Sequence, residues 1–156
     1  MNVTVRIEGL GRVLAKLNTD WGSVLTNITW SIGELIRNEM ARYPGPRSGP
    51  VRWTSERQRR FYHAMRREKG LSLVYTRRTD PMSQDLGAGW TVDRYGAHGA
   101  VVAAHASYAP YVQSHTVQQR FHADTGWVTD KQAVERVERS GDVQRIGEAA
   151  IRRALR

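Results

Sequence analysis

Hydrophobic residues recur along the chain at two different spacings, and these spacings predict the order of its elements. The longest helical pattern runs from Asp20, a candidate N-cap, to the residue before Pro44, which cannot continue a helix. Within it, apolar residues recur at steps of three or four, as in an amphipathic helix: Trp21, Val24, Leu25, Ile28, Ile32, Leu35, Ile36, Met40 and Tyr43. We expect this helix to organise the fold and to bury four side chains against a sheet: Ile28, Ile32, Leu35 and Ile36.

A second helix is expected over residues 55–69. Ser55 and Gln58 have the spacing of a capping box, and Gly70 supplies a stop signal. At about 100° per residue, four arginines share one arc of this helix: Arg59, Arg60, Arg66 and Arg67. The opposite arc carries Phe61, Tyr62 and Met65. The sequence therefore predicts an amphipathic helix with an arginine face.

Alternation with a period of two predicts strands elsewhere. It covers residues 2–7, 71–76 and 90–93, while residues 100–106 are apolar on both faces, as in a central strand. The last two segments flank a turn at 96–99, so we expect them to form an antiparallel hairpin.

Capping residues and helix breakers predict three further helices towards the C-terminus. They span about residues 108–113, 129–139 and 142–154. The signals are Pro110 for the first, Thr129 with Gln132 for the second, and Ser140-Gly141 followed by Asp142 for the third.

Polar or proline-rich stretches near residues 44–53, 79–88 and 114–128 are expected to be exposed loops. Residues 1–156 should then form one α+β domain. In it, a long N-terminal amphipathic helix packs on a small, mostly antiparallel sheet, with a basic helix and C-terminal helices beside it.

Charge changes this picture at one place. The chain has 24 basic residues, mostly arginine, against 15 acidic ones, for a net charge of +9. The whole excess lies between Arg42 and Arg78, and the rest of the chain is balanced. One basic segment on a neutral body indicates a surface that meets a polyanion or an acidic protein. The alternative is a solvated arginine face.

Other compositional features exclude several classes of site. There is no cysteine, so disulfides and thiolate metal sites are excluded. The longest apolar run, residues 100–104, is far shorter than a membrane span, and the alternating N-terminus is unlike a signal peptide. We expect a soluble protein with no membrane contact.

The histidines are the first candidates for chemistry: His63, His98, His105, His115 and His122. His115 and His122 lie near Asp124, but no pair has the spacing that places two metal ligands on one helix face. No phosphate-binding glycine loop or carboxylate dyad is present either. We therefore expect no catalytic residue, metal, cofactor or enzymatic activity. The catalytic alternative is a ribonuclease-like toxin, with two histidines as an acid–base pair.

The arginine helix could also bind nucleic acid. A helix-turn-helix needs a second helix a few residues upstream, where this chain has a proline-rich segment at 44–50. Non-specific contact with phosphates stays open. A monomeric, basic nucleic-acid-binding protein that uses residues 55–69 is therefore the alternative to an assembly subunit.

Four aromatic residues in polar or proline-containing surroundings are candidates for interface anchors: Trp53, Tyr108, Tyr111 and Trp127. Aromatic residues of this kind also pin loops to their own core, which is the alternative for each of them.

Two blocks of motifs stand out along the chain. The first block runs from Trp53 to Tyr62, then Tyr75 to Thr79, then Leu86-Gly87 and Trp90. The second runs from Tyr108 to Gln113, followed by Gln118-Gln119, His122 and Gly126-Trp127. Together with the opening, a strand followed by Glu8-Gly9-Leu10 and two helices, these blocks resemble a family of small neck proteins of long-tailed phages, known as tail-completion, head–tail joining or minor tail proteins. One departure is the six residues 80–85, because the family usually joins the two flanking motifs almost directly.

The resemblance implies a structural virion protein of the phage neck, assembled in the host cytoplasm. It implies a ring of copies, a tail terminator or head–tail connector, that joins the tail tube to the head. The implied partners are other neck and tail proteins, with transient DNA contact in the channel, and the family has no catalytic residues. We expect the interface to include the arginine face and the four aromatic residues.

Overall fold

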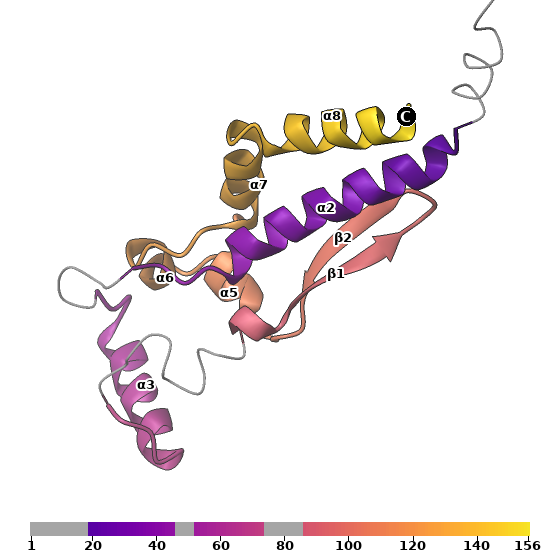
Figure 1. The fold of residues 1–156 in the computed structure, drawn as a ribbon. Helices are drawn as coiled ribbons and strands as arrows, with labels where there is room; N and C mark the ends of the chain where they lie inside the picture. The colour runs from indigo at the N-terminus through magenta and orange to yellow at the C-terminus, as the bar shows by residue number, and fades with distance from the viewer. Residues whose placement is uncertain (1–18, 46–51, 74–85) are drawn as a thin grey trace, which may run out of the picture.

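The computed structural model describes residues 19–45, 52–73 and 86–156 (Figure 1). The strand expected at 2–7 and most of the one expected at 71–76 lie outside these residues, as do 46–51 and 79–85 of the expected loops. The described part has an α+β fold. Its elements are α2 (Trp21–Ala41), α3 (Glu56–Glu68), β1 (Trp90–Tyr95), β2 (Gly99–Ala104), α5 (Ala109–Gln113), α6 (Arg120–Asp124), α7 (Asp130–Arg139) and α8 (Asp142–Ala154).

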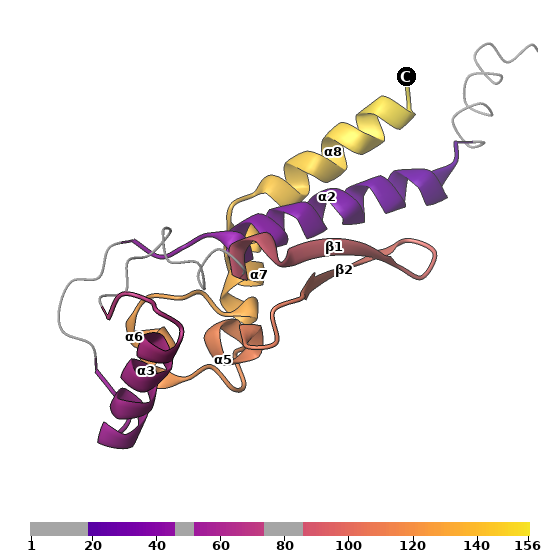
Figure 2. The same cartoon turned by 90° about the horizontal axis from the view of Figure 1, so that it is seen from below.

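The long helix α2 lies between two thin layers. The β1–β2 hairpin covers one side of it and α8 runs along the other, an order that both views show (Figures 1 and 2). Asp20 caps the helix, since its side chain accepts a hydrogen bond from the backbone N–H of Ser23 at 3.2 Å. The predicted long helix is therefore confirmed, with its start at the expected cap.

The burial of α2 differs from the expectation. Its buried residues are Gly33 and Met40, whereas the four expected side chains are only half-buried: Ile28, Ile32, Leu35 and Ile36. A two-stranded hairpin is too narrow to enclose the whole apolar stripe. Gly33 marks the closest approach, because a Cβ atom there would lie 2.8 Å from Cγ1 of Val92.

The predicted hairpin is confirmed. β1 and β2 pair antiparallel in an unbroken register from Trp90↔Ala104 to Tyr95↔Gly99. Its turn is fixed to α2, where the hydroxyl of Thr29 donates to the carbonyl oxygen of His98 at 2.6 Å. The expected strand at 71–76 is different, because residues 71–73 have no strand structure.

The main core lies at the C-terminal end of α2. One cluster contains Leu86, Ala109, Val112 and Trp127, a second contains Met40, Val128 and Ala133, and Trp90 packs against both. The buried amide of Gln113 donates to the carbonyl oxygen of Met40 at 2.8 Å and accepts from the indole N–H of Trp90 at 3.2 Å. Gln113 therefore satisfies a carbonyl that the helix end leaves without an intrahelical partner.

The C-terminal half contains more structure than the sequence indicated. The capping box of Thr129 and Gln132 is confirmed at the start of α7. The expected loops at 114–128 and 79–88 are wrong in part, because 114–128 contains α6 and the buried Trp127, and Leu86 is also buried. Gly141, at φ +74°, caps α8 in place of Asp142, since only glycine readily adopts that conformation.

Candidate interaction site

We call residues 52–73 the arm, and residues 19–45 and 86–156 the body. The arm contains α3, which lies at the end of the molecule away from the C-terminus (Figures 1 and 2). At its start, the hydroxyl of Ser55 accepts from the N–H of Gln58 at 3.1 Å. At its end, Gly70 has φ +63° and the N–H of Leu71 reaches the carbonyl oxygen of Arg66 at 2.8 Å. The side chain of Gln58 accepts from the N–H of Thr54 instead of Ser55, so the predicted capping box is only half formed. The cap at Ser55 and the stop at Gly70 are in place, and α3 begins and ends as the sequence indicates.

A cluster of aromatic rings, which we call the joint, connects the arm to the body. Trp53 stacks on Phe121 of α6, with ring centroids 5.4 Å apart and planes 16° apart. Trp53 also contacts Tyr62 at 5.1 Å and His63 at 5.8 Å, both on α3. Phe121 in turn contacts His122 at 4.9 Å. The joint thus consists of one loop tryptophan and of aromatic side chains from α3 and α6.

Two imidazoles in the joint lack a hydrogen-bond partner on one nitrogen. Nδ1 of His63 and Nδ1 of His122 are both buried without a partner. Burial lowers the pKa of His122 to about 4, because a charged imidazolium loses its hydration there. His122 is therefore neutral at physiological pH and contributes to the joint as an apolar ring.

Arg66 does not belong to the exposed arginine face. Arg66 is only 2% exposed. Its Nε donates to the carbonyl oxygen of Ser72, and its guanidinium lies over the ring of Tyr62. Helical spacing alone could not reveal this difference, because the contact with Ser72 comes from the segment that follows α3. The prediction of four arginines on one solvent-facing arc is wrong for Arg66, and Phe61, expected on the packed side, is 70% exposed.

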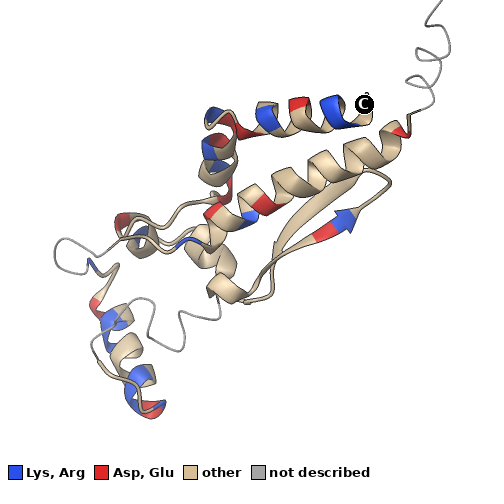
Figure 3. Cartoon of the chain, in the orientation of Figure 1, with Lys and Arg blue, Asp and Glu red and all other residues tan. Residues whose placement is uncertain are grey.

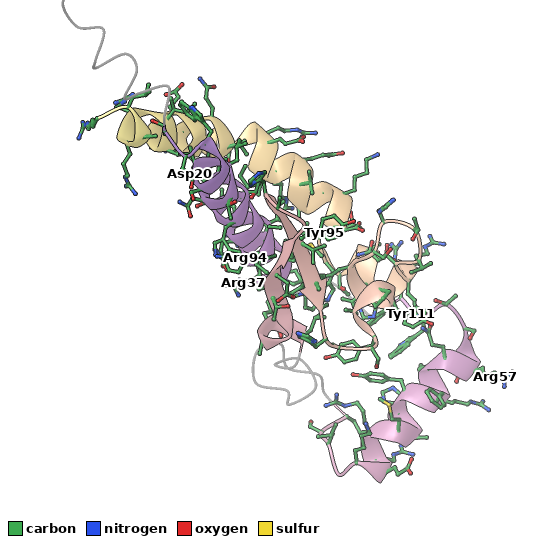
Figure 4. The ribbon with its side chains drawn as sticks, turned by 90° about the vertical axis from the view of Figure 1, so that its right-hand side faces the viewer. Asp20, Arg37, Arg57, Arg94, Tyr95 and Tyr111 are labelled. Carbon is green, nitrogen blue, oxygen red and sulfur yellow. The ribbon has the colours of Figure 1, made fainter. Side chains whose placement is uncertain are left out.

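The outer face of α3 carries the other arginines. Arg59 and Arg60 both reach Glu56, at 2.7 and 3.2 Å. Arg57 and Arg67 are exposed, with no ion pair to any described residue, and Arg57 points away from the body (Figure 4). Basic residues predominate along α3 and alternate with acidic ones on α7 and α8 (Figure 3). The outer face of the arm is therefore basic and available to a partner.

The four candidate aromatic residues have different environments. Trp127 is buried in the core and meets Tyr43 edge-on at 5.2 Å. Tyr108 packs against the same cluster, and Trp53 lies in the joint. Only Tyr111 of the four is largely exposed, at 53%. For Trp53, Tyr108 and Trp127 the structure thus shows contacts within the chain.

In the part of the chain that the structure describes, no three His, Asp or Glu residues come together as a possible metal site. Nδ1 of His115 lies 2.9 Å from a carboxylate oxygen of Asp130, whereas His122 faces the joint. Partial burial opposes ionisation of Asp130, but hydrogen bonds from the N–H groups of His115 and Lys131 outweigh it and lower the pKa of Asp130. This pair fixes the start of α7.

Sequence reasoning missed a second basic surface, on α8. Side chains along one stripe of this helix line an open hollow of about 390 Å³: Arg145, Glu148, Ala149, Arg152, Arg153 and Arg156. The spacing of its arginines is visible in the sequence, but the balance of charge over the whole chain outside residues 42–78 conceals it.

Comparison with known protein families, with curated proteins and with solved structures finds no match for this chain. Among the described helices, none combines the length and the apolar character that crossing a membrane requires.

Proposed function

We propose that this protein is a structural subunit of the neck of a long-tailed phage, a ring-forming tail-completion protein that joins the tail tube to the head. The observation that carries the proposal is the arm, whose outer arginines are directed away from their own domain. The resemblance of two sequence blocks to the phage neck family is the reason for proposing the neck as the assembly in which this protein acts.

The outer face of the arm suits contact with an acidic protein surface. Arginine has a planar fork that pairs with carboxylates in a fixed geometry. Arg57 and Arg67 have no ion pair to a described residue that a partner would need to displace. DNA has to slide through a neck, and a strongly basic lining would retard it through phosphate contacts. A neighbouring neck or tail protein therefore fits this face better than DNA does.

A second candidate function is a monomeric nucleic-acid-binding protein. The observation that favours it is Phe61, which is 70% exposed beside the arginines of α3. An exposed aromatic ring among arginines is suited to stacking on an unpaired base, with phosphates held nearby. This function does not require any oligomer.

Native mass spectrometry of the purified chain, alone and with the proteins encoded beside it, tests the two candidates. The neck function predicts a closed ring or a complex with those neighbours. A chain that stays monomeric in every mixture and shifts single-stranded DNA at low salt would overturn the neck function and support the alternative. A double variant, Arg57→Glu with Arg67→Glu, should abolish the DNA shift if the arm is responsible.

A further inference from the structure

The hairpin presents two strand edges that nothing in the described chain covers. The N–H of His105 donates to the carbonyl oxygen of Gly89 at 2.9 Å, which fixes the hydrogen-bonded pairs of the ladder. Because such pairs alternate in an antiparallel ladder, the outward backbone groups belong to six residues: Trp90, Val92 and Arg94 on β1, and Ala100, Val102 and Ala104 on β2. No described residue forms a hydrogen bond with these outward groups.

The edge of β2 lacks the features that normally protect a free strand edge. Natural edges carry charges, prolines or bulges that prevent pairing with another chain. β2 has none of these, since its sequence is Gly-Ala-Val-Val-Ala-Ala and its register is unbroken. Its outer side chain Val101 is 45% exposed. This strand therefore has the composition of an interior strand at the position of an edge strand.

The strand that already pairs with β2 shows what fits its open edge. Along most of the hairpin, the β1 residue is larger than its β2 partner, as in Trp90↔Ala104 and Tyr95↔Gly99. Small residues on β2 leave room for large ones on the strand beside it. A second β1 strand would match the edge of β2 in the same way. No described residue bonds to the outer edge of β1, which carries the charged side chains of Asp93 and Arg94.

We propose that β2 of one copy pairs antiparallel with β1 of the next copy, so that the hairpins join into one sheet. Each copy then uses one edge of each kind, which is a head-to-tail contact of the type that closes into a ring. α2 remains on the covered face of every hairpin, and the arm remains free for other proteins. This inference rests on the proposed ring and names the surface that builds it.

The absence of cysteine allows a direct test by disulfide trapping. Val101 lies on the outer face of β2, so its closest neighbours on an added β1 strand are the outer-face residues Thr91, Asp93 and Tyr95. A chain with Val101→Cys is mixed with a chain carrying Thr91→Cys, Asp93→Cys or Tyr95→Cys, and the mixture is assembled under mild oxidation. Each of the three positions would lie opposite Val101 in a different register of the two strands.

We expect a disulfide between the two different chains for at least one of the three mixtures. A disulfide only between two Val101→Cys chains would instead show a symmetric β2–β2 contact and would overturn the inference. Rings that form without any mixed disulfide would overturn it as well, while leaving the proposed function in place.

Two edge variants test the same contact through the mass of the assembly. Ala100→Pro removes one outward N–H without breaking a bond to β1, and Val101→Lys adds a charge beside the edge. Both should give folded single chains where the natural chain gives rings. Val117→Lys is the control, since Val117 is 50% exposed outside any strand, and it should form rings normally. If the natural chain forms no ring, the proposed function fails; if both edge variants still form rings, the edge contact fails.

Discussion

The arm and the body are stabilised in different ways. The arm has seven basic residues against two acidic ones and meets the body through the rings of the joint. The body has eleven basic residues against ten acidic ones and contains both buried apolar clusters. The body can therefore fold on its own core, whereas the arm depends on a small aromatic contact. Under the proposed function, the body would then provide stability and the contact between copies, and the arm would provide recognition of a partner.

Residues of the same chemical type also differ in burial and in their contacts. Arg66 faces the joint and supports the end of α3, while Arg67, its neighbour, faces solvent. Trp127 supports the core of the body, while Tyr111 is exposed on it. Substitutions at such pairs give the sharpest tests of the division of roles.

The largest expected effect is in the core of the body. Trp127→Ala should lower the free energy of unfolding by about 3–5 kcal/mol, because it leaves a cavity beside Tyr43 and Leu86. Urea unfolding measures this loss. Tyr111→Ala, at an exposed aromatic residue, should change the same quantity by less than about 0.5 kcal/mol. Equal small effects for the two variants would mean that Trp127 is not part of the core.

The contact between α2 and the hairpin gives the next effect. Gly33→Ala should destabilise the body by about 1 kcal/mol, because the new methyl group meets Val92 while the gain in helix propensity offsets part of the clash. Gly147→Ala on α8 is the matched control, since nothing lies within 4 Å of a Cβ there, and it should stabilise by up to about 1 kcal/mol. Thermal unfolding distinguishes the two signs, and a stabilised Gly33→Ala would contradict the close approach.

The joint can be weakened without touching the core. Trp53→Ala should speed tryptic cleavage at the arginines of α3 by about 5- to 10-fold, because it removes the stack on Phe121. The unfolding midpoint of the body should stay unchanged. Phe61→Ala on the exposed side of the same helix should leave the cleavage rate as it is. A common loss of arm and body stability in Trp53→Ala would show that the two regions fold as one unit.

Acid should weaken the joint by a graded amount. His122 has a pKa of about 4 in the folded chain, below its ordinary value of 6.5. The unfolded state therefore binds more protons between these values, and stability falls as the pH drops through this window, by at most about 1.4 kcal/mol per pH unit.

An NMR titration of the His122 ring measures this pKa, and amide protection of α3 follows the joint. We expect the protection to fall with the His122 titration and to lose its pH dependence in His122→Phe. A ring that titrates near pH 6.5 would show that His122 is solvated and not part of the joint.

The sequence predicted the elements whose signals are local. The cap at Asp20, the capping box at Thr129, the stop at Gly70 and the hairpin are all in place. Each depends on a few neighbouring residues whose conformational preferences are strong. These signals made the α+β class and the order of most described elements accessible without a structure.

The failures concern contacts between distant segments. Arg66 lies over Tyr62 and bonds to the carbonyl oxygen of Ser72, beyond the end of α3, and Trp127 packs against Tyr43. Helical spacing gives the direction of a side chain but not which arc another segment covers. For the same reason the half-burial of the α2 isoleucines and the short helix α6 were missed.

The central claim is that the arm recognises another protein of the phage neck, and exposed arginines allow it to be tested directly. The arm variant combines Arg57→Glu with Arg67→Glu, and the body variant combines Arg152→Glu with Arg153→Glu, so both change the net charge equally. Arg66 is left intact because it is buried. Each variant is supplied to a phage that lacks its own copy of the gene, and the yield of infectious particles is measured. We predict that the arm variant folds but yields few particles and that the body variant yields normal numbers; a normal yield from the arm variant would contradict the claim.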